Sequence, residues 1–184
     1  MSVPDTPFWN YSVAVYDRAD VASVCLTLQD RFRLDVNLIL LCCWLGSRGI
    51  ILDHAKATRA IDIAEEWASP VIGPIRAVRR HLKKTTTDEF ILQLRTQISA
   101  LELEVEKIQQ YRLYKSFDTL PPALDPKILR ITAGNLMNYL AAQGRALDPS
   151  LREILTKLLA AVFPDEAEAD IVSSVAIPAA NPMK

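Results

Sequence analysis

The chain has 184 residues, of which 50% are hydrophobic and 23% are charged, and its formal net charge is −1. This length and balance suffice for a sizeable core that needs neither disulfides nor a structural metal. A net charge near zero provides no global field toward nucleic acid or membranes, so any such binding has to be local.

The scarcity of glycine, at 5 residues, favours helices over turn-rich β structure. No segment reads as a secretory signal or as an apolar stretch long enough to cross a bilayer. The three cysteines are an odd number without metal-ligand spacing. We therefore expect a reduced, cytoplasmic protein that holds no metal or other cofactor.

The most informative segment is the apolar block 35–46, in which Leu38–Leu45 are apolar without a break. A helix that is apolar on every side has to be surrounded by other elements. Asp35 can cap its start, and Gly46 and Gly49 are expected to end it. We predict the central helix of an all-α core here, with Cys42 and Cys43 as packing residues, because adjacent helical side chains diverge and cannot chelate one ion comfortably.

Two segments follow this block. Asp53 starts a helix that is expected to run to about Ser69 and to be stopped by Pro70. The next helix, 70–84, is basic, because no acidic residue occurs from Ala68 to Thr87. It carries Arg76, Arg79, Arg80, Lys83 and Lys84.

The longest predicted helix covers residues 88–116. Its apolar positions alternate in steps of three and four, which is a heptad pattern that extends over less than three heptads. The seam favours packing within the protein, and a homodimer through helix 88–116 stays open as the alternative. The seam consists of Ile91, Leu94, Ile98, Leu101, Val105 and Ile108.

Asp125-Pro126 and Asp148-Pro149 indicate two further helix starts, since Asp caps a helix and Pro suits its first turn. The second of these helices is expected to end before Pro164. We predict one compact domain over 6–163, a bundle of about seven or eight helices around the central helix, followed by a flexible tail over 164–184 that is acidic and rich in Ala and Pro.

Two blocks of uncommon residues resemble an uncharacterised proteobacterial family, known as domain-of-unknown-function family 2390. The resemblance is expected to extend to about Phe163. It implies a bacterial, cytoplasmic setting and transfers no active site. The first block contains Phe8-Trp9, Val15-Tyr16, Cys25-Leu26, Leu28-Gln29-Asp30, Leu34-Asp35-Val36-Asn37-Leu38 and Cys42-Cys43-Trp44-Leu45-Gly46, and the second contains Trp67, Val71, Pro74-Ile75-Arg76 and Arg79-Arg80-His81-Leu82-Lys83.

The five cations of helix 70–84 are the candidate site for a partner or a polyanion. They cluster on one side of the helix, where RNA or an acidic membrane surface could bind. In the competing interpretation the arginines pair with acidic residues of the chain, either around Asp62 and Glu65-Glu66 or in the Glu102–Glu106 cluster.

The sequence offers little support for an enzyme. It contains no phosphate-binding Gly loop, nucleophile elbow or paired metal-ligand motif. A helical enzyme would need Asp62, Glu65 or His54 to converge in a pocket. We therefore expect a non-catalytic adaptor or regulatory protein that binds another protein through a helix face, with polyanion binding and a helical enzyme as the alternatives.

Overall fold

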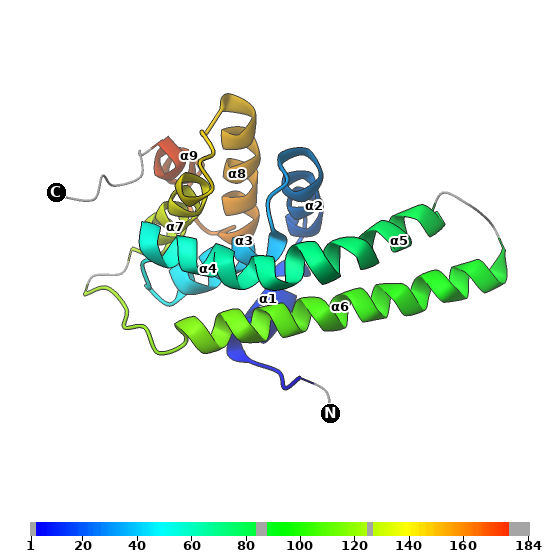
Figure 1. Ribbon diagram of the computed structural model, residues 1–184. Coiled ribbons are helices and arrows are strands. Elements are labelled where there is room, and N and C mark those ends of the chain that lie inside the picture. Colours follow the sequence, from blue (N-terminus) through cyan, green and yellow to red (C-terminus); the bar gives the residue numbers. More distant parts are fainter. Residues whose placement is uncertain (1–2, 84–87, 125–126, 177–184) are drawn as a thin grey trace.

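The computed structural model describes residues 3–83, 88–124 and 127–176, and these residues form helices and connecting loops without a strand (Figure 1). The predicted all-α bundle is confirmed, with α4 and α5 joined into one long rod by a π-helical turn, Ala68–Ile72. The α-helices are α1 Pro7–Tyr16, α2 Val21–Phe32, α3 Val36–Ser47, α4 His54–Trp67, α5 Gly73–Lys83, α6 Glu89–Phe117, α7 Ile128–Ala142, α8 Pro149–Val162 and α9 Glu168–Ala176.

Helix α3 is the central helix that the sequence predicts. Every residue from Asn37 to Gly46 is buried, and α1, α2, α4, α6 and α7 pack against the helix. Asp35 caps it as expected, because its Oδ1 accepts hydrogen bonds from the backbone N–H groups of Asn37 at 2.7 Å and Leu38 at 3.2 Å. The all-round apolar character of this helix thus reflects a position inside the bundle.

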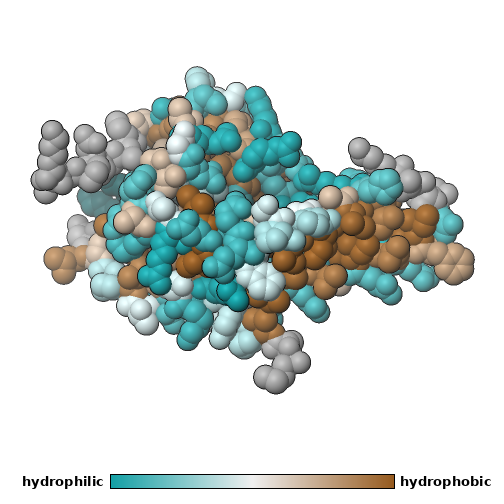
Figure 2. Space-filling view, viewed as in Figure 1, coloured by the Kyte–Doolittle hydropathy of each residue, from teal (hydrophilic) through white to brown (hydrophobic). Residues whose placement is uncertain are grey.

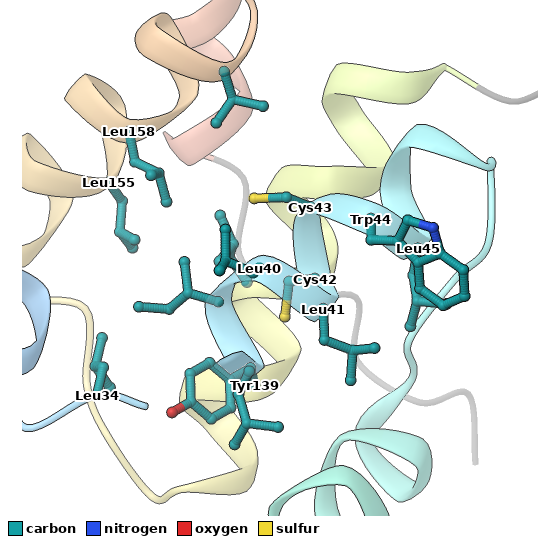
Figure 3. Close-up of a cluster of buried hydrophobic side chains, with 14 of the residues drawn as sticks. Leu34, Leu40, Leu41, Cys42, Cys43, Trp44, Leu45, Tyr139, Leu155 and Leu158 are labelled. Carbon is teal, nitrogen blue, oxygen red and sulfur yellow. The ribbon is translucent and has the colours of Figure 1, made fainter. Parts of the chain in front are cut away.

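The three cysteines are buried free thiols, as predicted for core residues. Figure 3 shows Cys42 and Cys43 pointing in different directions from α3 among leucine side chains. Burial raises the pKa of Cys25 to about 12 and also raises the pKa values of Cys42 and Cys43. Thiols in this state are poor nucleophiles and metal ligands.

Gly46 does not end α3, contrary to the sequence-based expectation. It lies inside the helix, and the turn that follows is made at Gly49, whose φ of 70° suits glycine. A Cβ atom at Gly46 would lie 2.0 Å from Thr132 Oγ1 and 2.7 Å from Thr132 Cα. Gly46 therefore allows α7 to approach α3 closely.

Pro70 does not stop the helix that begins at His54. The chain passes through the π-helical turn, where the N–H of Gly73 donates to the carbonyl of Ala68, and continues as α5. Pro lacks an N–H and therefore cannot make the usual helical bond, and the wider turn accommodates it without ending the rod.

Ordered structure also continues beyond Phe163, into the stretch expected to be a flexible tail. Helix α9 packs against α7 and α8 and buries Ile171 and Val175. Arg152 Nη1 donates to the carbonyl of Val175 at 2.8 Å. The expectation of a tail over 164–184 is corrected for α9, whereas residues 177–184 lie outside the described part of the chain.

Helices α5 and α6 form an antiparallel pair whose distal part projects from the rest of the molecule (Figure 1). We call α5 and the segment 89–103 of α6 the arm. The two halves of α6 differ in surroundings, because its buried residues begin only at Glu102 and α5 has none. Besides α5, helix α6 packs against α1, α3, α4 and the π-helical turn, and Figure 1 shows its first half running beside α5.

Candidate functional site: the arm

Two of the five predicted site cations lie at the base of the arm, in ion pairs with α6. Arg76 Nε donates to Glu102 Oε1 at 2.9 Å, and Arg76 Nη2 donates to Glu106 Oε1 at 2.6 Å. Arg79 Nε donates to Glu102 Oε2, and its Nη2 donates to Glu102 Oε1 at 3.2 Å. The alternative in which the arginines pair with the Glu102–Glu106 cluster is therefore the one observed.

Burial and charge act against each other on these two carboxylates. Burial alone would raise the pKa of Glu102, but hydrogen bonds from Arg79 and Arg76 outweigh it, so the pKa is lowered. Burial raises the pKa of Glu106 by more than Arg76 lowers it. Glu102 is thus the anion that holds the two arginines, and it ties α5 to α6 at the point where the arm leaves the body.

The other three predicted cations lie farther along α5. Arg80 pairs with Asp30 of α2, and Lys83 is exposed at the end of the helix. Lys84 lies outside the described residues. The structure therefore joins Arg76, Arg79 and Arg80 to acidic partners instead of presenting them together as an open basic face. Charge reversal at these positions would also break contacts between helices, so it cannot isolate partner binding from stability.

The arm carries an exposed apolar surface that the pattern of charged residues does not predict. Phe90 is 81% exposed, Leu94 47% and Leu101 48%. Their spacing of four and seven residues places these three side chains, which we call the arm stripe, on one face of α6. Leu92 and Leu103 are exposed on the opposite flank of α6. Figure 2 shows apolar side chains gathered over the projecting arm.

The heptad seam was the sequence signal for this surface. Leu94 and Leu101 belong to that seam and are about half exposed, whereas Val105, one step further along, is buried. The seam is therefore more deeply buried in the C-terminal half of α6 and stays partly exposed in the N-terminal half. Its periodicity predicts an apolar face and cannot indicate where the neighbouring helices stop.

The residues required by the enzyme alternative do not converge. His54, Asp62 and Glu65 all lie exposed on α4. Among residues 3–83, 88–124 and 127–176, no group of three or more His, Cys, Asp and Glu side chains is placed to hold a metal ion. Within the same residues, every helix is too short or too polar to cross a bilayer.

Body and arm together define an all-α protein with a buried central helix and a projecting helix pair that carries an exposed apolar stripe. Residues 7–113 match the family model described as "Protein of unknown function (DUF2390)", and the match covers more than half of the sequence, so the chain belongs to this family. The resemblance seen in the sequence is confirmed over a shorter stretch than expected, since the match ends in α6. No curated protein and no solved structure matches the chain.

Proposed function

We propose that this protein is a non-catalytic adaptor or regulatory protein that binds another protein through its arm. The observation that supports the proposal is the exposed arm stripe of Phe90, Leu94 and Leu101. Single exposed apolar side chains are common, but several on one projecting element are typical of an interaction surface. The arm lies within the region matched by the family model, so the surface belongs to the family segment of the chain.

The partner that fits this surface is a protein with an apolar groove or an amphipathic helix. An exposed helix recognises such a partner through apolar side chains three, four and seven residues apart. The ion pairs of Glu102 with Arg76 and Arg79 hold α5 against α6, so the arm loses little freedom on binding. A surface of a few large side chains suits transient binding in which those side chains carry most of the affinity.

The polyanion alternative has less support, because Arg76, Arg79 and Arg80 are paired with acidic residues. We also propose a bacterial, cytoplasmic setting. The resemblance to a proteobacterial family supports the bacterial origin, and the three buried free thiols suit a reducing compartment.

Affinity capture with matched variants tests the proposal. The bait is the full chain as wild type, as Leu94→Gln/Leu101→Gln, or as the control Ile51→Gln/Val172→Gln, which changes two apolar residues of similar exposure outside the arm. We expect wild type and control to capture a specific bacterial protein. The captured amount of this protein should be at least about fivefold lower with the arm variant. Purified partner and bait should reproduce this order of affinities in a binding titration.

Two results would contradict the proposal. One is an identical set of captured proteins for the arm variant and the control, when all three baits have the same melting temperature. The other is loss of capture with the control variant alone, which would place the binding surface on the body. Salt-sensitive retention of RNA by all three baits would favour the polyanion alternative.

A further inference from the structure

A cavity of about 360 Å³ lies beneath the base of the arm, between α1, α2, α3, α5 and α6. Its apolar wall includes Val13 of α1, Leu26 of α2 and Leu40 of α3. Val13 and Leu26 are about half exposed, and Leu40 is buried, so the wall extends from the surface to the central helix. Cavities of this size that combine apolar walls with a few polar groups are typical of small-molecule sites.

Three buried amide side chains lead from the core to this cavity. Gln109 Nε2 donates to the backbone carbonyl of Ala64 at 2.9 Å, and this carbonyl can only accept. Gln109 Oε1 therefore faces Asn37 and accepts from its Nδ2, which leaves Asn37 Oδ1 to accept from Gln110 Nε2 at 2.8 Å. Each orientation follows from the one before it, so the last free group is the acceptor Gln110 Oε1.

Gln110 lines the cavity, and its Oε1 is buried without a hydrogen-bond partner among the described protein atoms. Ser12, which also lines the cavity, has a buried Oγ atom in the same state. Buried polar atoms in proteins almost always have partners. Each of the two oxygens has less than 1 Å² of accessible surface, so a bound group reaches either of them only after a small rotation of its side chain. Gln110 Oε1 can only accept, so a group that meets it is a hydrogen-bond donor.

The charged residues of the lining restrict the charge of that group. Arg76 and Arg79 face Glu102 and Glu106 in ion pairs, so the two cations are matched by two acidic residues. The remaining charged residue of the lining, Asp17, is exposed to water. An anionic ligand would meet no unpaired cation there, and a cationic one would meet only Asp17, whose charge is screened by water.

We propose that this cavity binds a small, uncharged organic molecule that has an apolar body and one hydrogen-bond donor, with the donor meeting Ser12 Oγ or Gln110 Oε1. The apolar wall supplies most of the affinity, and the two oxygens discriminate between molecules with and without a donor. The site is separate from the arm stripe, since none of Phe90, Leu94 and Leu101 lines the cavity.

Two bicyclic probes of nearly the same shape test this proposal. Indole carries one N–H donor, and 1-benzofuran has a ring oxygen in its place. Titration of the full chain, followed by amide chemical shifts, should give an affinity for indole about fivefold higher than for 1-benzofuran, which is the effect of one hydrogen bond. The shifts should centre on residues of α1, α3 and α6 that line the cavity.

Matched variants locate the binding. Val13→Trp places a large side chain in the cavity and should abolish binding of both probes, whereas Val172→Trp, at a similarly exposed valine of α9, should leave it unchanged. If Val13→Trp does not fold, Leu26→Trp fills the cavity from α2. The proposal is overturned if neither probe binds, if both bind equally, or if a folded cavity variant binds like wild type. None of these outcomes bears on capture through the arm, so the two proposals fail separately.

Discussion

At the scale of single residues, the close packing of α3 against α7 depends on one glycine. Gly46 of α3 lies against Thr132 of α7. The side chain and the Cα of Thr132 both lie too close to the position that a Cβ atom on residue 46 would occupy. The neighbouring Asn135 adds polar contacts, since its Oδ1 accepts from the N–H of Leu52 at 2.7 Å and its Nδ2 donates to the carbonyl of Ile50 at 3.0 Å. Backbone proximity therefore permits both the apolar packing and these hydrogen bonds.

Gly46→Ala should lower the free energy of unfolding by about 1–3 kcal/mol, the usual cost of overpacking a core. Rotation of Thr132 cannot relieve the clash, because its Cα is also too close. The control is Gly134→Ala in α7, where nothing lies within 4 Å of a new Cβ. Removing a glycine from a helix interior should there raise stability by about 0.5–1 kcal/mol. Urea unfolding of both variants measures the difference, and equal effects would contradict the close approach.

The role of Gly46 could not be predicted from the sequence. A glycine near the end of an apolar run is most often a helix terminator, and that rule works at Gly49. What distinguishes Gly46 is its contact with α7, and local sequence does not contain that contact. The burial of Cys42 and Cys43 was predictable for the opposite reason, because an uninterrupted apolar environment surrounds them in the sequence itself.

At the scale of helices, one buried carboxylate ties α5 to α6 at the base of the arm. Glu102 accepts from Arg76 and from Arg79, which lie one turn apart on α5, and its lowered pKa shows that the folded state favours its ionised form. A carboxyl group with a lowered pKa stabilises the fold above its ordinary value, here 4.5, and loses that contribution as the pH falls toward the folded-state value.

Glu102→Gln should therefore destabilise the protein by about 2 kcal/mol near neutral pH, because two guanidinium groups lose a charged acceptor. The difference from wild type should shrink as the pH falls below 4.5, where protonation removes the same charge from wild type. Glu106 is present in both proteins, and its pKa, which the charge of Glu102 helps to raise, should be less raised in the variant. Thermal unfolding from pH 7 to pH 3 measures the effect, with the exposed Glu104→Gln as control. A pH-independent difference would show that charge is not the cause.

The sequence predicts helices well where a local signal sets their ends. Asp148 caps α8 by accepting from the N–H of Leu151 at 2.8 Å, and Asp53 caps α4 in the same way with Lys56 at 2.9 Å. Prediction fails where the tertiary structure overrides a local rule, as at Pro70, or where a short segment is helical mainly because it packs, as in α9. The basic residues of α5 were visible in the sequence, whereas their pairing depends on the antiparallel packing of α6.

At the scale of the whole molecule, the two proposed sites occupy different environments. The cavity lies among five helices and reaches α3, in which every residue from Asn37 to Gly46 is buried. The arm stripe lies where α6 has left the body. A rigid body with a projecting helix pair allows the protein to present an apolar surface without exposing its core. The cluster around Glu102 is common to both, since it lines the cavity and holds the two helices of the arm together at their base.

The small size of the arm stripe argues against a stable dimer of this chain. In a two-fold dimer the same flank of each arm faces its mate, so Leu92 and Leu103 would stay exposed if the arm stripes paired. A stable interface also takes about 20–30 residues from each partner, far more than the arm stripe contains. We therefore expect light scattering to give the mass of one chain across the micromolar range. A dimer that becomes a monomer in Leu94→Gln/Leu101→Gln would instead identify helix 88–116 as a self-interface, whereas a dimer that persists in this variant would place the self-interface on the body.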